Sequence, residues 1–225
     1  MEGMEMRRPD YEDDPSVGSA LENSSEKTER RIRDLEKSSE TDSLTGLLNR
    51  SGLKAHAERL RDNLEKKRRE GDPTDRKIVF ALGDIDKFKA VNDTFGHAAG
   101  DKVLQAVARS LKSNIRAGDI VGRNGGEEFV LALTIDSGAS AERIVDAVRE
   151  AVERTEVTWE GRRIPITMSF GIADGEEMPE DSLDEEETER EIHRADKAMY
   201  AAKRRGRNCA VLFSRMTPKE LQEAA

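Results

Sequence analysis

The chain carries the run Arg123-Asn124-Gly125-Gly126-Glu127-Glu128-Phe129, and this run decides its fold. An Asn-Gly step between apolar segments is a strong hairpin signal, because the favoured two-residue turns need positive φ angles that these residues tolerate. The glycines leave bare backbone at the hairpin tip, where a flat or phosphate-bearing ligand can approach beside two metal-binding carboxylates. The same run also fits a purely structural turn, so the rest of the sequence has to separate the two interpretations.

The apolar pattern on either side of the hairpin predicts a mixture of strands and helices. Short apolar runs bounded by turn residues are typical of strands, and apolar residues three or four positions apart are typical of helices. We expect helices at 26–39, 51–70, 100–115, 139–154 and 189–204, strands at 78–82, 164–173 and 208–213, and a solvated acidic loop at 178–191. This order is βαββαβ with extra pieces. It predicts an α+β fold, an antiparallel sheet backed by helices, with an N-terminal helical extension.

Length, charge and cysteine content exclude several classes of protein. At 225 residues the chain suits one domain of ordinary size with an appendage. A formal net charge of −9 argues against a general nucleic-acid binder, because such proteins usually present a basic face. The single cysteine, Cys209, excludes an internal disulfide and a cysteine-cluster metal site. The sequence shows no signal-peptide pattern and no long apolar run, so we expect a cytoplasmic protein without direct membrane insertion.

Two pairs of acids are candidates for a metal site. Asp84 and Asp86 follow a short apolar run and fall on the same side of the predicted strand, because side chains alternate. Paired carboxylates repel each other, and a divalent cation relieves the repulsion. A polar strand end or a helix cap would explain this pair without a metal. If the strand that carries Glu127 and Glu128 lies alongside, the acids converge on a hard oxygen site suited to Mg²⁺.

The segment from Lys87 to Asp101 is dense in polar groups. Its lysines can neutralise phosphates. A guanine edge presents both donors and acceptors, and Asp101 can accept from the donor pair while the Asn92 amide bonds the remaining positions. Asp101 is also explained as the cap of the following helix, and His97 as an ordinary loop histidine.

Several blocks together resemble the GGDEF family of diguanylate cyclases, here in the Gly-Gly-Glu-Glu-Phe form. They are the hairpin run and the segments 42–50, 82–101, 167–171 and 195–208, in the family's order and spacing. The match covers residues 41–213 and implies a palm-like fold, related to nucleotide cyclases and ferredoxins. We expect a disordered acidic tail at 1–25, a helical linker or short coiled coil at 26–40, the catalytic domain at 41–215 and a C-terminal tail at 216–225.

The resemblance implies a metal-binding and catalytic role for residues that match the family's motifs. Asp84, the Ile85 carbonyl and Glu127 are the implied ligands of Mg²⁺, with two ions in each active site and Mn²⁺ able to replace them. Glu127 is also implied to help take a proton, with Glu128 beside it. Lys89 is the implied phosphate contact that stabilises charge in the transition state.

The resemblance also implies the residues that bind the nucleotide. Asn92 and Asp101 are the implied guanine readers, with His97 nearby. Lys203 and Arg207 are the implied clamps on the β- and γ-phosphates, and their i, i+4 spacing would place them on one helical face. A basic helix end is also explained by the helix dipole alone. The remaining implied substrate-binding residues are Phe88, Gly125 and Gly126.

The implied reaction joins two GTP molecules into cyclic di-GMP and releases two pyrophosphates. One domain holds one GTP, so two domains must face each other in a homodimer, at least transiently. Arg116 and Asp119 match the Arg-x-x-Asp inhibitory site of many family members, which implies inhibition by the product, and Arg123 is a further candidate there. Without the resemblance, this common tetrapeptide reads as an exposed ion pair.

Two other classes of function stay open at this point. A receptor with the same fold would bind GTP or cyclic di-GMP without turnover and signal through a partner. Degenerate members usually lose a site acid, so the presence of Asp84, Glu127 and Glu128 disfavours that interpretation. An unrelated palm-fold nucleotidyl transferase would also use paired acids and Mg²⁺, but the combination of Asn92, Asp101 and the hairpin argues against it.

Overall fold

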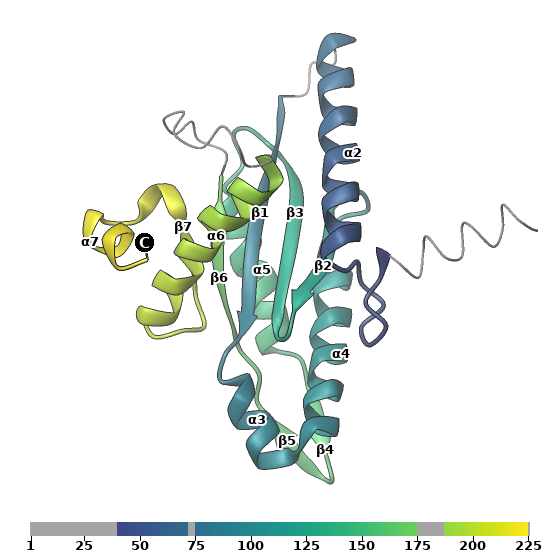
Figure 1. The fold of residues 1–225 in the computed structure, drawn as a ribbon, viewed down its shortest axis with the longest axis vertical. Coiled ribbons are helices and arrows are strands. Elements are labelled where there is room, and N and C mark those ends of the chain that lie inside the picture. Colours follow the sequence, from purple (N-terminus) through teal and green to yellow (C-terminus); the bar gives the residue numbers. More distant parts are fainter. Residues whose placement is uncertain (1–39, 72–74, 175–186, 225) are drawn as a thin grey trace, which may run out of the picture. The chain divides into compact units, whose positions relative to one another are not determined.

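The computed structural model of the chain describes residues 40–71, 75–174 and 187–224. Its main sheet has five strands in the order β2-β3-β1-β6-β7 (Figure 1). The strands are β1 (Arg76–Ile85), β2 (Ile120–Gly125), β3 (Glu128–Asp136), β6 (Met168–Ala173) and β7 (Ala210–Leu212). All neighbours are antiparallel except β6 and β7, which run parallel. The predicted α+β fold with a largely antiparallel sheet is confirmed.

Helices cover both faces of this sheet. They are α2 (Arg50–Arg69), α4 (His97–Ser113), α5 (Ala141–Glu153) and α6 (Glu187–Arg204). The short helix α3 (Phe88–Phe95) packs against α4 beyond the end of β1 (Figure 1). Side chains alternate along β1, so Phe80 and Leu82 pack with α2 and α6, while Val79 and Ala81 pack with α4 and α5. In Figure 1, α2 lies to the right of the β1–β3 pair and α6 to its left, and both belong to the layer that packs on Phe80 and Leu82. Near the carboxyl end of β1, Asp84 contacts Lys203 of α6.

The predicted strand at 164–173 is interrupted. β5 (Arg162–Ile164) pairs with β4 (Val157–Trp159) in a separate two-stranded sheet, and β6 begins only at Met168. Pro165 follows β5 and has no backbone N–H to donate, so it suits the break. The prediction of one continuous strand is therefore wrong. The sequence does not reveal the break because Ile164 and Ile166, on either side of Pro165, are both buried and continue the apolar pattern.

Two segments that the sequence predicts to be irregular are helical. Residues 187 and 188, predicted as part of a solvated loop, begin α6, whose predicted start was residue 189, and Thr188 and Glu191 in its first turn are buried. Residues after Met216, predicted only as a tail, form α7 (Pro218–Glu223), which follows the short 3-10 helix η1 (Phe213–Arg215). Thr217 and Glu220 make a capping box at the start of α7, a sequence signal that the prediction overlooked.

The predicted tail at 1–25, the predicted helix at 26–39 and the remaining loop residues 175–186 lie outside the described residues. Among the helices that the structure describes, none combines the length and apolarity that crossing a bilayer requires. All residues with a predicted functional role lie in the described ranges.

Candidate active site

Acidic side chains meet at the end of β1. Asp84 is the second-last residue of that strand, opposite Glu128 of β3 and Ser169 of β6. It is buried, and its Oδ2 lies 2.9 Å from the Nζ of Lys203 on α6. Burial raises the pKa of Asp84, Lys203 opposes the rise, and the charges of Glu128 and Asp86 add to it. An ionised carboxylate in this position needs a positive charge beside it.

The β2–β3 hairpin presents open backbone next to these acids. Gly125 pairs with Glu128, so Gly126 and Glu127 form the tip, and the φ angles of the two glycines are 152° and 49°. The tip is displaced by two residues from the expected Asn124-Gly125 turn, because the pairing shifts at a bulge between Arg123 and Gly125. A Cβ built on either glycine would meet nothing within 4 Å. The bare backbone that the sequence predicts at the tip is therefore present.

Glu127 lies close enough to Asp84 to be affected by its charge. The backbone N of Ile85 donates a hydrogen bond to the Glu127 carbonyl at 3.3 Å. Burial, and then the negative charge of Asp84, raise the pKa of Glu127. Two carboxylates and the Ile85 carbonyl offer only oxygen donors, the set that a hard cation such as Mg²⁺ prefers, so the donors fit the implied metal. In the described part of the chain, no three His, Cys, Asp or Glu side chains form a metal-binding group by themselves.

Arg123 ties the hairpin to the turn that opens the domain. Its Nε and Nη2 donate to the Gly126 carbonyl at 3.0 and 2.7 Å, and its Nη1 donates to Asp42 at 3.2 and 3.1 Å. Burial alone would raise the pKa of Asp42, but hydrogen bonds from Thr45 and Arg123 hold it below its usual value. All three guanidinium nitrogens of Arg123 are engaged here, and it does not line the hollow around Arg116. Its assignment to the inhibitory site therefore stays a prediction.

Asp86 does not act as a pair with Asp84. Its carboxylate accepts hydrogen bonds from Thr167 Oγ1 at 2.7 Å, from Ser169 Oγ at 2.6 Å and from the backbone N of Asn208 at 3.0 Å. Because β1 ends one residue earlier, strand alternation no longer sets the direction of this side chain. Asp86 instead ties together the end of β1, the start of β6 and the loop after α6.

The predicted guanine-reading residues lie on two successive helices. Asn92 is on α3, and a Cβ built on Gly100 of α4 would come within 2.0 Å of its side-chain oxygen. Asp101 is the next residue of α4 and is exposed. It is not a helix cap, because Gly96 occupies that position, and His97 is the first residue of α4 rather than a loop histidine. The structure thus brings Asn92 next to Asp101 across the α3–α4 contact.

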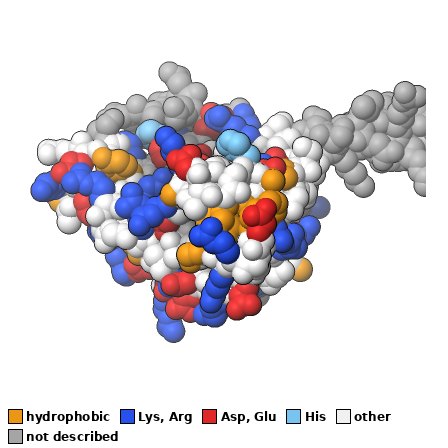
Figure 2. Space-filling view, turned by 90° about the horizontal axis from the view of Figure 1, so that it is seen from below, with side chains coloured by type: hydrophobic (Ala, Val, Ile, Leu, Met, Phe, Trp, Pro, Cys, Tyr) orange, Lys and Arg blue, Asp and Glu red, His pale blue; other side chains and the backbone are white. Residues whose placement is uncertain are grey.

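The predicted phosphate contacts come from different elements. Lys89 is exposed in the first turn of α3, next to the buried Phe88. Lys203 lies in the last turn of α6, whereas Arg207 lies beyond the end of that helix with a φ of 70°. The prediction that both share one helical face is wrong, because the chain leaves the helix through Gly206, whose φ is 115°. Figure 2, seen from below Figure 1, shows basic and acidic side chains interspersed over this end.

The Arg-x-x-Asp tetrapeptide forms a turn of its own. The carboxylate of Asp119 accepts from the backbone N of Arg116 at 3.0 Å and from that of Thr134 at 2.9 Å. This fixes the turn and leaves Arg116 exposed. Its neighbours in a hollow of about 600 Å³ include Lys66 and Lys67 of α2. Several cations around one hollow suit an anionic ligand.

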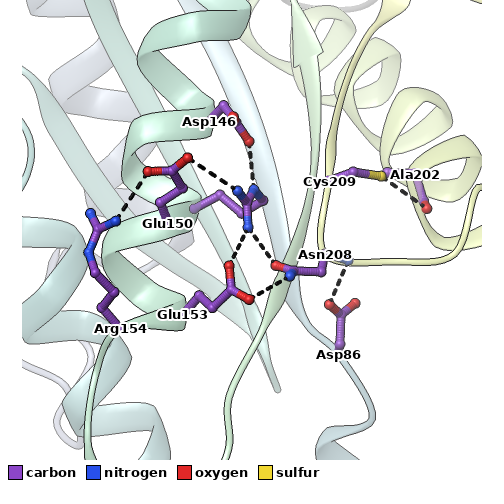
Figure 3. Close-up of polar contacts among 9 residues, drawn as sticks. Asp86, Asp146, Glu150, Glu153, Arg154, Ala202, Asn208 and Cys209 are labelled. Carbon is purple, nitrogen blue, oxygen red and sulfur yellow. Dashed lines mark hydrogen bonds and ion pairs between the residues drawn. The ribbon is translucent and has the colours of Figure 1, made fainter.

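No role is predicted from the sequence for Arg149 of α5. It is buried and donates a hydrogen bond to Asn208, which Figure 3 labels on the loop after α6. Arg149 falls on the same helical stripe as Val145, Val148 and Val152, all of them buried. A charged residue on an apolar stripe is the signal that could have found it.

Comparison with known proteins identifies the family. The sequence model described as "Diguanylate cyclase, GGDEF domain" matches residues 39–209. The chain therefore belongs to the GGDEF family of diguanylate cyclases. The resemblance that the motifs indicate is confirmed.

Particular relatives give the extent of the similarity. Diguanylate cyclase A of Treponema denticola is 40% identical over 142 residues, which are 63% of this chain and 37% of that protein. Diguanylate cyclase DgcP of Pseudomonas aeruginosa is 39% identical over 168 residues, 75% of this chain and 23% of that protein. The chain thus spans well under half of the length of these relatives. The coiled coil and GGDEF domain of DgcB from Caulobacter crescentus, in complex with c-di-GMP, has a TM-score of 0.69 and 28% identity, covering 88% of this chain and 99% of that one.

Proposed function

We propose that the chain is a diguanylate cyclase that condenses two GTP molecules into cyclic di-GMP with release of two pyrophosphates. One observation carries the proposal: Asp84, Glu127 and Lys203 meet beside the open backbone of the hairpin, in a chain of the GGDEF family. The catalytic domain in this proposal is residues 41–215.

Mg²⁺ would be held by the carboxylates of Asp84 and Glu127 and by the carbonyl of Ile85, with two ions in each site and Mn²⁺ able to replace them. A metal bound there lowers the pKa of the attacking 3′-hydroxyl and neutralises phosphate charge. Lys203, which pairs with Asp84 in this structure, has a second anion within reach once a triphosphate binds. Its contact can then pass from the acid to the substrate.

Side chains of the protein take the proton and bind the phosphates. Glu127 accepts the proton of the 3′-hydroxyl, a role that its raised pKa favours because the carboxylate becomes a stronger base. Glu128 adds negative charge beside it. Lys89 and Arg207 bind phosphate oxygens, with Phe88 packed under the start of α3. The open backbone at Gly125 and Gly126 gives the triphosphate room to approach.

Residues of α3 and α4 select the base of the nucleotide. Asp101 accepts from the N1–H and N2–H donors of guanine, Asn92 bonds the remaining positions, and His97 stands at the start of the same helix. Adenine lacks that donor pair, so Asp101 would have no partner and ATP is a poor substrate.

The product acts as an inhibitor in this proposal. Arg116 would stack on a purine of cyclic di-GMP and bind its phosphate, with Lys66 and Lys67 lining the same hollow. Asp119 already accepts hydrogen bonds from two backbone N–H groups. In this proposal it fixes the conformation of the turn and also contacts the ligand. Because the hollow is lined by residues distinct from the site acids, inhibition would be allosteric.

The experiment that tests the function is incubation of the purified chain with GTP and Mg²⁺, with products resolved by chromatography. Parallel runs contain ATP, Mn²⁺ in place of Mg²⁺, or the Glu127→Gln variant. We expect cyclic di-GMP from GTP alone, none from the variant, and faster accumulation with Arg116→Ala. If neither the wild type nor Arg116→Ala turns over GTP while cyclic di-GMP still binds, the chain is a receptor and not a cyclase.

A further inference from the structure

A buried arginine, Arg149, connects α5 to the loop after α6, where Figure 3 labels its partner Asn208. Arg149 is 9% exposed and contacts three acids of its own helix: Asp146 at 2.6 Å, Glu153 at 2.8 Å and Glu150 at 3.8 Å. The side chains of these acids are 46%, 44% and 48% exposed, so they neutralise the guanidinium from the solvent side. The Nη1 of Arg149 nonetheless donates a further hydrogen bond, at 2.7 Å, to Asn208 outside the helix.

Asn208 is held at three points. Its side-chain oxygen accepts from Arg149, its Nδ2 donates to Glu153 at 3.0 Å, and its backbone N donates to Asp86 at 3.0 Å. The φ of Asn208 is 47° and that of Arg207 is 70°, so two consecutive residues with side chains adopt the left-handed conformation. This conformation is unfavourable for residues other than glycine and persists only where surrounding contacts impose it.

The strained loop borders the proposed phosphate site. One hollow is lined by Asp86, Lys87, Arg207 and Asn208, together with residues of α3 and of the segment between β5 and β6. Three of the four non-glycine residues with positive φ in the described part of the chain lie on this hollow, since the φ of Lys87 is 56°. Backbone strain of this kind gathers at functional sites, where the surrounding structure holds it in place.

We propose that Arg149 and Asn208 are positioning residues that hold the loop after α6 so that Arg207 points at the β- and γ-phosphates of GTP. The proposal rests on the proposed function. Arg149 and Glu153 fix the amide of Asn208 from the side of α5, and Asp86 fixes its backbone N from the end of β1. Between these anchors Arg207 has its conformation set before the nucleotide arrives, which lowers the cost of binding.

The same contacts would also fit a cluster that only stabilises the fold by tying α5 to the loop. The two roles differ in what they affect. A purely structural cluster lowers the melting temperature and leaves the affinity of the folded protein for GTP unchanged. A positioning role acts through Arg207, so its effect on affinity disappears when the Arg207 side chain is removed.

The test is a double-mutant cycle of Arg149→Met and Arg207→Ala. GTP binding is measured by titration calorimetry in a Glu127→Gln background, where no turnover occurs, and KM and kcat are measured in the active chain. Arg154→Met is the matched control, because Arg154 pairs with Glu150 on the same helix at 3.1 Å. We expect Arg149→Met to weaken GTP binding and raise KM about tenfold with little change in kcat. In the Arg207→Ala background it should have no further effect, and the control should bind GTP as the wild type does.

Asn208→Gly provides a second, independent variant. Glycine adopts the left-handed conformation without strain, so the fold is kept while the amide anchors are lost. We expect the same rise in KM at an unchanged melting temperature. The proposal is overturned if Arg149→Met and Asn208→Gly leave GTP affinity unchanged, or if the loss caused by Arg149→Met persists without Arg207.

The test separates this proposal from the proposed function. A wild type that binds GTP without making cyclic di-GMP overturns the cyclase assignment, and the binding cycle still decides the role of Arg149. A wild type that makes cyclic di-GMP, with a KM that Arg149→Met does not change, overturns the positioning role alone. A chain that binds no GTP overturns both.

Discussion

Two acids near the end of β1, Asp84 and Glu127, lower the stability of the folded protein. Burial raises the pKa of Asp84 and of Glu127, and the charge of Asp84 raises that of Glu127 further. An acid whose pKa is higher in the folded protein than in the unfolded chain binds its proton more tightly when folded. The free energy of unfolding therefore decreases as the pH rises from the unfolded-state pKa through the folded-state pKa.

Glu127→Gln is therefore expected to raise the melting temperature at pH 7, in EDTA, by about 1–3 °C. The gain should vanish near pH 3.5, below the unfolded glutamate pKa of about 4.3, because both side chains are then neutral. Mg²⁺ should raise the melting temperature of the wild type more than that of the variant. Scanning calorimetry at the two pH values checks this, and a variant that melts below the wild type at pH 7 would contradict it.

Individual residues show how far sequence reasoning reaches. The types and spacing of Asp84, Glu127 and Asp101 indicate their place at a site, because paired acids and exposed polar groups at element ends carry their own chemical signal. The hydrogen-bond partners of a side chain are harder to predict from the sequence. Arg123 bonds Asp42, 81 positions away along the chain, and Asp86 bonds Asn208, 122 positions away. No local pattern encodes such contacts, so the sequence does not predict the partners of these two side chains.

At the scale of elements, the position of α6 depends on a close approach to β6. A Cβ built on Gly171 would lie 1.9 Å from the Ala195 carbonyl oxygen and 2.1 Å from the Met199 N, both in the α6 backbone. Gly171→Ala is expected to displace α6 and lower the free energy of unfolding by about 2–4 kcal/mol. GTP binding should weaken too, because α6 carries Lys203.

Urea denaturation measures the loss in Gly171→Ala. The matched control is Gly138→Ala, because a Cβ built on Gly138 meets nothing within 4 Å. The control should unfold at the wild-type urea concentration. If both variants do so, the close packing of α6 on β6 does not limit stability.

The C-terminal helix α7 is attached through an ion pair that acid should release. Hydrogen bonds from Arg205, and then from Thr217, lower the pKa of Glu220 to about 2. A lowered acid pKa contributes stability above the unfolded-state value, and this contribution is lost as the pH falls toward 2. Glu220→Gln should therefore melt a few degrees below the wild type at pH 7, and the difference should shrink between about pH 4.5 and pH 2. Parallel thermal melts across this range check it, and a constant difference would contradict it.

Elements with a strong pattern of their own were predicted well, and elements defined by tertiary contact were not. The apolar run at 78–82 and the helix at 51–70 appear as β1 and α2 because burial on one or both faces imposes their pattern. The apolar pattern does not reveal the break after Ile164, because Ile166 is also buried. The hairpin tip lies two residues beyond the predicted Asn-Gly turn because a bulge, which depends on both strands, sets the register.

At the scale of the whole molecule, the described site holds one set of the predicted nucleotide-binding residues. The candidates for guanine and phosphate contacts lie at one end of β1, on α3, α4 and the end of α6. Each 3′-hydroxyl must attack the α-phosphate of a second GTP, so the reaction that we propose needs a second chain to supply it. Encounter between chains then contributes directly to the rate.

The specific activity of the chain is therefore expected to rise with protein concentration until the homodimer is fully formed. Removing residues 1–40, which include the predicted coiled coil, should shift the half-maximal concentration upward by about tenfold, because the link that keeps two sites together is lost. Initial rates across a dilution series, with light scattering on the same samples, check this. GTP affinity per chain in the Glu127→Gln background should be equal in both lengths, which controls for misfolding. Constant specific activity in samples that scatter as monomers would show that one chain completes the reaction alone, and the dimer would have to be abandoned.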